Sequence, residues 1–254
     1  MTMATKKKYG FVIDIARCID CRACLVACSV ENSVPMTDTR IWVYTPEIQG
    51  EFPDLTRTFI PYNCMHCENP PCVDVCVSRA TFKDQENGLV LVDQEACIGC
   101  GYCVDACPYD ARYLDKEHGV VDKCNGCIQR VEVGLQPACV ATCLGGSRMF
   151  GDLNDPDSEV SQALKNAANV LRLDFEDEKV DTDPNIYYIN YTGMTDPLIL
   201  PDKTLPRPPE YTLSQASWKK VFVPVMAAAV GGAFLVQAVY FTKQLIQGES
   251  EFEE

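Results

Sequence analysis

The sequence predicts an α+β fold in which short β-hairpins and short helices surround cysteine-rich loops, followed by one C-terminal transmembrane α-helix. Three observations predict this fold. The 254 residues include 16 cysteines, and these fall into four groups of four. Short apolar segments flank the cysteine groups at recurring positions. A stretch of 22 uncharged, mainly apolar residues lies near the C-terminus.

The composition bounds the class of protein. Hydrophobic residues make up 47% of the chain and charged residues 23%, which is typical of a globular protein. The formal net charge is −14, whereas nucleic-acid-binding proteins usually present a basic surface, so we expect no nucleic-acid partner. No apolar run follows the N-terminal Lys6, Lys7 and Lys8, and we therefore expect no secretory or twin-arginine signal.

The spacing of the cysteines predicts iron–sulfur clusters. The first and third groups have the spacing C-x2-C-x2-C-x3-C, in which three thiolates hold one cluster and the fourth reaches a neighbouring cluster. The second and fourth groups lengthen the middle gap and keep the final x3 step. Sixteen thiolates are enough for four 4Fe–4S clusters. The groups are Cys18, Cys21, Cys24 and Cys28; Cys64, Cys67, Cys72 and Cys76; Cys97, Cys100, Cys103 and Cys107; and Cys124, Cys127, Cys139 and Cys143.

Disulfides and structural zinc are the alternative uses of these cysteines. Disulfides suit small secreted scaffolds, but no secretory signal is expected and the cysteines within each group lie too close to staple a loop. Four-cysteine zinc sites usually combine two C-x2-C pairs across a long spacer, and only the fourth group resembles that pattern. Scattered core cysteines do not account for a spacing that occurs four times.

The segments around the cysteines repeat as strand, loop, short helix and strand. Two turns, at residues 86–88 and 117–119, are expected to close hairpins. One such unit is half of a two-cluster ferredoxin-like module and cannot bury its own cluster, so the units should pair. The expected strands are residues 11–14, 91–93 and 120–122 before cysteine groups, and 80–83, 111–114 and 147–150 after them.

The predicted domains follow in order along the chain. A four-cluster ferredoxin-like domain spans 1–150, with an insertion at 30–62 that contains strand-like stretches at Arg40–Tyr44 and Thr56–Ile60. An acidic segment and a proline-rich strap span 151–217, with one helix expected at Glu159–Leu171 and the strap at 184–215. The transmembrane helix spans 218–246 and an acidic tail 247–254.

The apolar stretch Val221–Thr242 predicts the transmembrane helix. At 1.5 Å per residue it spans roughly 33 Å, enough for a hydrocarbon core of about 30 Å. Trp218 and Tyr240 lie near its two ends and are typical of the membrane interface. A buried core helix or a surface helix is the alternative, which the lack of a polar face disfavours. Small residues at 227–233 favour packing against a second membrane helix.

The motifs resemble the four-cluster ferredoxin-like electron-transfer subunits of the DMSO reductase / polysulfide reductase superfamily. The resemblance covers about residues 9–190. The chain departs from the usual pattern in its C-terminal apolar segment, and in having Val77 and Leu144 where proline usually follows the last cysteine of a group. The motifs that carry the resemblance are CIDCRACLVAC, CMHCENPPCVDVC, CIGCGYCVDACPYDARYL, KCNGCIQRVEVGLQPACVATC and FGDLNDP, in that order.

The resemblance also implies which cysteines share a cluster. In that family the first group pairs with the fourth, and the second group pairs with the third. We refer to the implied ligand sets as A to D. Set A is Cys18, Cys21, Cys24 and Cys143; set B is Cys124, Cys127, Cys139 and Cys28; set C is Cys64, Cys67, Cys72 and Cys107; and set D is Cys97, Cys100, Cys103 and Cys76.

The function that the resemblance implies is electron transfer by a non-catalytic subunit of a respiratory oxidoreductase complex. The implied partners are a molybdopterin-type catalytic subunit and an integral membrane quinone-binding subunit, and Val221–Thr242 is expected to contact membrane lipid. Two alternatives stay open: the equivalent subunit of a membrane hydrogenase or of another respiratory complex, and a membrane-tethered ferredoxin. The resemblance favours the periplasmic side for the cluster domain, whereas Lys219 and Lys220 before the helix favour the cytoplasmic side.

Five further residues near the cysteines are open to two interpretations. Arg112, Arg130 and Arg148 either stabilise reduced clusters or are ordinary surface bases. His66 lies in a cysteine loop and His118 in an expected turn, and both are expected at the surface or at the edge of a cluster. A hydrogen bond from His66 that tunes a cluster is the alternative for that residue.

Overall fold

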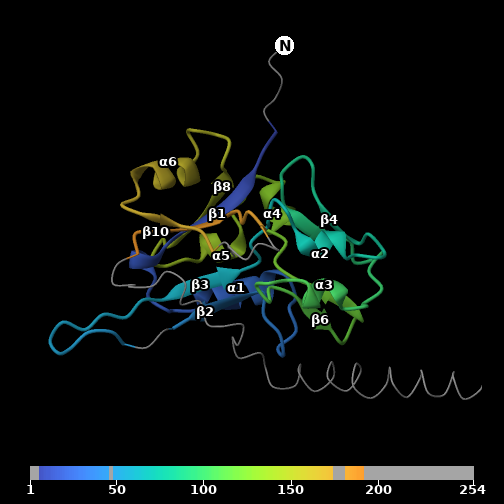
Figure 1. Cartoon of the computed structure of the whole chain (residues 1–254), viewed down its shortest axis with the longest axis horizontal. Coiled ribbons are helices and arrows are strands. Elements are labelled where there is room, and N and C mark those ends of the chain that lie inside the picture. The colour runs from blue at the N-terminus through green and yellow to red at the C-terminus, as the bar shows by residue number, and fades with distance from the viewer. Residues whose placement is uncertain (1–5, 46–47, 174–180, 192–254) are drawn as a thin grey trace, which may run out of the picture. The chain divides into compact units, whose positions relative to one another are not determined.

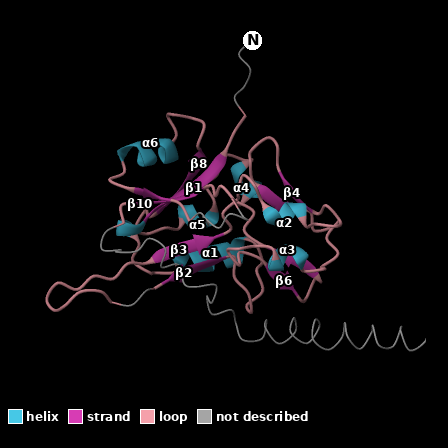
Figure 2. Cartoon of the chain, viewed as in Figure 1, coloured by secondary structure: helices cyan, strands magenta, loops and turns pink. Residues whose placement is uncertain are grey.

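Residues 6–45, 48–173 and 181–191 are described by the computed structural model and belong to one compact unit, residues 1–200 (Figure 1). Short helices and strands alternate along these residues (Figure 2), which confirms the mixed character expected of the fold. The strands are β1 (Tyr9–Asp14), β2 (Ile41–Tyr44), β3 (Ile60–Asn63), β4 (Thr81–Lys83), β5 (Val90–Val92), β6 (Tyr113–Asp115), β7 (Val120–Asp122), β8 (Arg148–Asp152), β9 (Val170–Leu171) and β10 (Ile186–Ile189). The helices are η1 (Ile15–Arg17), α1 (Ala23–Glu31), α2 (Pro71–Asp74), α3 (Tyr102–Asp105), α4 (Ile128–Val131), α5 (Ala138–Ala141) and α6 (Glu159–Asn166).

A four-stranded sheet in the order β8-β1-β10-β9 is the largest element of the fold. Strand β1 runs antiparallel to β8 and parallel to β10, so Phe11 lies between Phe150 and Ile186. Nearly all of β1 is buried, as expected for a strand with neighbours on both sides. Helix α6 covers one face of the sheet, where the fully buried Val160 packs with Val12. The other face packs against the cysteine loops.

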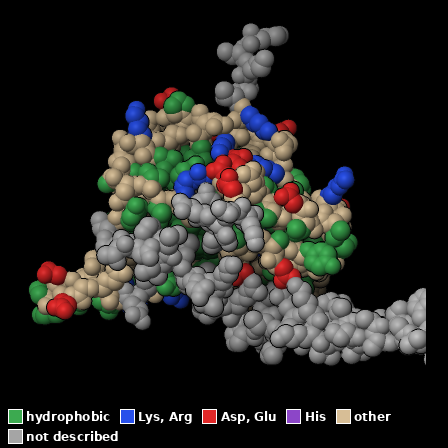
Figure 3. Space-filling model, viewed as in Figure 1, with side chains coloured by type: hydrophobic (Ala, Val, Ile, Leu, Met, Phe, Trp, Pro, Cys, Tyr) green, Lys and Arg blue, Asp and Glu red, His purple; other side chains and the backbone are tan. Residues whose placement is uncertain are grey.

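Three separate hairpins complete the fold. Strands β4 and β5 pair around the turn expected at 86–88, and β6 and β7 pair around the turn expected at 117–119, so both hairpin predictions are confirmed. The third hairpin joins β2 to β3. Between these two strands an arm projects from the body (Figure 1), and its tip carries hydrophobic and acidic side chains (Figure 3). Glu51, Phe52 and Asp54, which lie between β2 and β3 in the sequence, are exposed.

Two expected elements have wrong boundaries. The second strand of the insertion begins at Ile60 and not at Thr56, because it pairs with β2 in the register that places Tyr44 opposite Ile60. Thr56 forms an isolated bridge to Gln49 inside the arm. The helix expected at Glu159–Leu171 ends at Asn166, because the next residues turn extended and Val170–Leu171 pair with β10 as strand β9.

Part of the expected strap is also a strand. Residues 186–189, at the start of the proline-rich stretch, form β10 and lie between β1 and β9 in the sheet. Among the described residues no helix combines the length and apolar character needed to cross a membrane. The transmembrane helix expected at Val221–Thr242 lies outside the described residues.

Candidate metal centres

Set A comes together where α1 meets the loop before β8. The Cys24 thiol has Cys143 and Cys21 as electrostatic neighbours, and Cys18 has Cys24 and Cys143. All four line one small hollow, together with the side chain of Arg148. The loop that precedes α1 therefore wraps this hollow from one side, while Cys143 closes it from a distant part of the chain.

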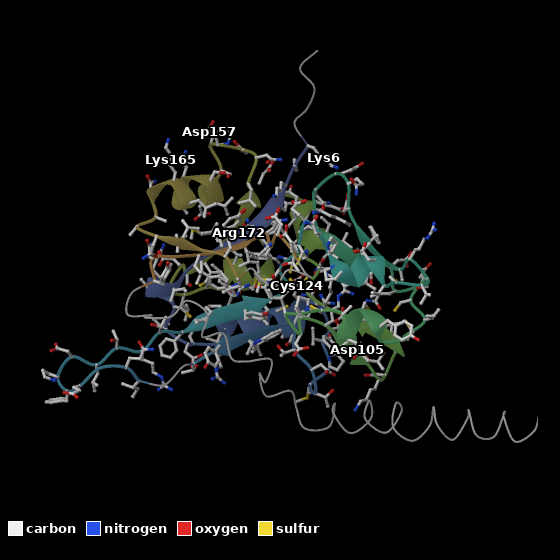
Figure 4. All side chains as sticks on the ribbon, in the orientation of Figure 1. Lys6, Asp105, Cys124, Asp157, Lys165 and Arg172 are labelled. Atoms are coloured by element: carbon white, nitrogen blue, oxygen red, sulfur yellow. The ribbon has the colours of Figure 1, made fainter. Side chains whose placement is uncertain are left out.

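Set B forms one helical turn further along. Cys28 follows Cys24 by four residues on α1, yet its neighbours are the thiols of Cys124, Cys139 and Cys127. All four thiols of the set are buried. Cys124 lies near the middle of the described fold (Figure 4). Consecutive cysteines of one sequence group thus face different neighbourhoods, as the x3 step predicts.

Set C combines the second and third cysteine groups. The neighbours of Cys67 are Cys64, Cys107 and Cys72. These four thiols line a second small hollow, and Arg112 forms part of its wall. Cys107 comes from the end of α3 and reaches the loop of the second group, so this pairing again crosses between groups.

For set D, the structure gives a separate contact for each of three members. The Cys103 thiol lies within electrostatic range of Cys72 in set C. Cys76 accepts a hydrogen bond from the backbone N–H of Thr81, and Cys97 accepts one from Val121. Cys100 is exposed. The described contacts bring together the thiols of sets A, B and C, and they place one member of set D, Cys103, beside set C.

Backbone N–H groups point at several cysteine sulfurs. Thr81 and Ser147 each donate to the sulfur of the preceding cysteine group at 3.2 Å, to Cys76 and Cys143 respectively. Both donors lie at the beginning of a strand that follows a short helix. Such bonds stabilise a thiolate that ligates a metal, and they set the reduction potential of an iron–sulfur cluster. This explains why a strand follows each of these groups at a nearly constant distance.

Burial controls the acidity of the thiols. It raises the pKa values of Cys107 and Cys124 to about 12, and it also raises those of Cys28 and Cys67. Neighbouring thiols raise these values further. The free thiols are therefore protonated at neutral pH, and metal binding must release these protons. Among the described residues no group of three or more His, Cys, Asp and Glu is arranged to hold a single metal ion.

Two of the three arginines in question are buried beside cysteines. Arg112 donates from Nη2 to the Cys72 sulfur at 2.9 Å, and Arg148 lies within electrostatic range of Cys24. Buried nitrogens of both guanidinium groups have no hydrogen-bond partner among the described residues. Arg130 instead forms a partly exposed ion pair with Glu31 at 2.8 Å, as expected for a surface base.

Lys123 is a third buried cation, and the sequence patterns did not reveal it. Its Nζ donates to the backbone carbonyls of Val90 and Cys124. The one available signal was its position directly before the fourth cysteine group. Buried cations without carboxylate partners fit an anionic group such as a thiolate-ligated iron–sulfur cluster, because a buried charge needs a counter-charge.

The two histidines differ. His66 is fully buried, which excludes the surface and leaves the edge of a cluster among its two expected positions; its Nδ1 accepts a hydrogen bond from Val90 N–H at 3.1 Å. Burial, followed by the charge of Lys123, lowers its pKa well below 6.5, and the ring is therefore neutral. His118 lies in the exposed turn between β6 and β7, as expected, and contacts Asp115.

The family model for a 4Fe-4S dicluster domain matches residues 55–153, which contain the last three cysteine groups. Over 77% of the chain and 76% of the relative, the sequence is 41% identical to a tetrathionate reductase subunit of Salmonella typhimurium. The chain belongs to a family of iron–sulfur subunits of oxidoreductase complexes. Other relatives of this iron–sulfur subunit are protein NrfC of Escherichia coli, 43% identical over 62% of the chain and 71% of the relative, and a selenate reductase subunit of Mesobacillus selenatarsenatis. The last is 37% identical over 70% of each chain.

Membership of this family confirms the cofactor prediction. The iron–sulfur subunit carries 4Fe–4S clusters, and its 16 cysteines match the number that four clusters require. The resemblance stated from the motifs is confirmed for the iron–sulfur part of the chain.

Proposed function

We propose that the chain relays single electrons between a molybdopterin-type catalytic subunit and an integral membrane subunit that binds quinone. A 4Fe–4S cluster, when bound, accepts and donates one electron at a time. In this proposal each cluster is held by one of the ligand sets A to D. The observation that carries the proposal is that thiols of successive sets, from A to D, lie within electrostatic range of one another; we call this succession of sets the row.

The row follows from three contacts between sets. Sets A and B meet because Cys139 has Cys24 as a neighbour. Sets B and C meet because Cys124 has Cys64 as a neighbour. Sets C and D meet at Cys72 and Cys103. Sets A and B, sets B and C, and sets C and D are therefore neighbours, and the order A-B-C-D is the path that we propose through the described residues.

Exposure at the two ends of the row supports docking of partners there. Cys21 of set A and Cys100 of set D are exposed, whereas all four cysteines of set B are buried. Exposed apolar side chains adjoin both end cysteines: Ile19 lies beside Cys21, and Ile98 lies beside Cys100. Exposed apolar surface next to a functional group is typical of a protein interaction site.

The names of the relatives support a catalytic partner. The relatives include subunits of tetrathionate reductase and of selenate reductase, and a protein named as a subunit implies at least one further subunit. The membrane partner and the periplasmic side rest on the family resemblance, and membrane attachment rests on the apolar stretch Val221–Thr242. These three points are parts of the proposal.

A pull-down of the tagged full-length chain from its native membrane, in mild detergent, tests the proposal. We expect about 16 irons per chain, as four 4Fe–4S clusters require, together with molybdenum or tungsten and a pterin-containing subunit. Iron with nickel would replace this proposal with the hydrogenase alternative. Iron without any partner would leave a membrane-tethered ferredoxin, and zinc in place of iron would refute the cluster assignment.

Substitutions at the row ends sharpen the test. We expect Ile19→Asp and Ile98→Asp each to lose a different co-purifying subunit while the iron content stays at the wild-type value. Val170→Asp is the matched control, because Val170 is also an exposed apolar residue but lies in β9, in the sheet rather than at a cysteine loop. The docking assignment is wrong if all three variants retain both partners.

A further inference from the structure

Three basic side chains are buried among the described residues: Arg112, Lys123 and Arg148, which are 5%, 2% and 2% exposed. None of them forms a salt bridge with a carboxylate in the described part of the chain. The half-buried Arg40, in contrast, has Asp122 as its partner. A buried charge without a counter-charge is strongly unfavourable, so the counter-charge of the three cations must come from another group.

Arg148 lies at the junction of sets A and B. Its electrostatic neighbours include Cys139 of set B and Cys24 of set A. It also lines the hollow that set A surrounds. The guanidinium is held by a hydrogen bond to Asn63 Oδ1 and by the ring of Phe11, whose centroid lies 5.6 Å away. The cation is therefore fixed between the two sets.

Lys123 lies at the junction of sets B and C. Both Cys124 of set B and Cys72 of set C have it as an electrostatic neighbour. Its ammonium group donates to Cys124 O at 2.6 Å and also to Val90 O. Two backbone carbonyls from different elements thus hold the charge in place, since Val90 belongs to β5 and Cys124 follows β7.

Arg112 lies at the junction of sets C and D. Its neighbours include Cys72 and Cys64 of set C and Cys103 of set D. One nitrogen donates to the Cys72 sulfur at 2.9 Å, and another donates to Thr81 Oγ1 at 3.1 Å. Each junction between adjacent sets therefore holds one buried cation, and each cation has neighbours in both sets that it separates.

We propose that Arg148, Lys123 and Arg112 are electrostatic bridges that stabilise an added electron on either side of the A-B, B-C and C-D junctions respectively. The inference rests on the proposed function as an electron relay. In each transfer one electron leaves one side of a junction and arrives on the other; the cation stays in place, and no bond forms or breaks and no proton moves. Because a fixed positive charge favours the reduced form on both sides, it raises both reduction potentials.

The test is a redox titration of the iron-loaded full-length protein, followed by electron paramagnetic resonance, with the variants Arg148→Gln, Lys123→Met and Arg112→Gln. We expect each variant to lower the potentials of two clusters and to leave the other two unchanged. The affected pairs should overlap, so that each inner cluster responds to two variants and each end cluster to one. The expected change is at least a tenfold fall in the ratio of reduced to oxidised cluster at a fixed potential, which is 59 mV for one electron.

Charge-preserving variants separate charge from packing. In Arg148→Lys, Lys123→Arg and Arg112→Lys, the ratio of reduced to oxidised cluster at a fixed potential should return most of the way to its wild-type value. Arg130→Gln is the matched control, because its charge is already neutralised by Glu31 and it is partly exposed, so all four potentials should stay within about twofold of wild type.

Two results would overturn the inference. One is that the neutral variants keep 16 irons and wild-type potentials; the other is that each variant shifts all four potentials equally, which indicates general loosening of the core. The three junctions are tested independently, so a variant that fails to retain iron leaves the other two decisive. A wild-type protein without four separate redox signals would refute the proposed electron relay itself. Failure of the relay can therefore be distinguished from failure of the electrostatic-bridge inference.

Discussion

Replacing Arg40 by methionine should destabilise the iron-loaded protein strongly. Arg40 precedes β2 in the insertion, and its guanidinium forms two parallel hydrogen bonds with Asp122 at the end of β7, at 2.7 and 2.8 Å. Tyr113 also donates to Asp122, and Arg40 donates to Asn125. This ion pair connects the insertion to the loop that carries Cys124.

The magnitude follows from the burial of the pair. The two side chains are only 10% and 12% exposed, so Arg40→Met leaves the Asp122 carboxylate buried without its partner. Removing one partner of a buried ion pair costs about 3–5 kcal/mol. Since about 1.4 kcal/mol corresponds to a tenfold change, unfolding should be faster by a factor of roughly 10² to 4 × 10³ if the pair is broken in the transition state.

The assay is the rate at which the iron–sulfur absorbance disappears at a fixed elevated temperature, because cluster loss makes unfolding irreversible. The single variants Arg40→Met and Asp122→Asn and the double variant form a double-mutant cycle. We expect the double variant to cost at least about 1.5 kcal/mol less than the sum of the single variants.

The matched control is Arg130→Met, which removes the more exposed pair with Glu31. It should change the rate by no more than about fivefold, which corresponds to about 1 kcal/mol. If Arg40→Met behaves like this control and the cycle is additive, the reasoning about the buried pair is wrong.

Three further predictions concern other parts of the chain. Cys28→Ala and Cys139→Ala should each abolish the same paramagnetic signal although they belong to different sequence groups, and loss of two different signals would refute set B. Because Asp115 raises the pKa of His118 above 6.5, the stabilisation by this pair is fully present below pH 6.5 and is lost as the pH rises through the folded-state pKa. A nuclear magnetic resonance titration of Asp115→Asn should show the imidazole pKa of His118 falling toward 6.5. An unchanged imidazole pKa would contradict this prediction. Val160→Ala removes two buried methyl groups that pack α6 on the sheet and should cost about 1.6 kcal/mol plus a cavity contribution, seen as a lower thermal midpoint, and an unchanged midpoint would contradict the packing described.

The local elements could be predicted because their signals are local. The turn at 117–119 and the strand at 120–122 were visible as a glycine-containing turn followed by β-branched residues. The helix expected at Glu159–Leu171 was too long because the same apolar residues suit a strand, and only pairing with β10 draws Val170–Leu171 into the sheet. Pairing between residues this far apart leaves no trace in a local pattern.

The buried basic residues show even more clearly that a local sequence pattern does not reveal contacts between distant segments. Arg130 and Arg148 each follow a cysteine of the fourth group, and the sequence did not indicate which of the two is buried. In the structure Arg130 lies at the end of α4 beside Glu31, whereas Arg148 starts a strand that is buried against β1. Nothing in the sequence indicated that Lys123 is buried, apart from its position directly before Cys124. Its ammonium group bonds to Val90 of β5, and this contact joins two segments that are separate in the sequence.

By itself the sequence determined the ligand chemistry of this protein. Sixteen cysteines in four groups, two with ferredoxin spacing and two with a longer middle gap, predict four 4Fe–4S clusters, because three thiolates of a group can wrap one cluster and the fourth reaches another. The pairing of the groups was implied only by the family resemblance, whereas the tertiary structure decided which thiols of successive sets are neighbours and where the three buried cations lie. The physical reason is that these properties depend on contacts between segments far apart in the sequence, such as Cys24 with Cys139, which are fixed by the packing of the sheet, the hairpins and the helices together.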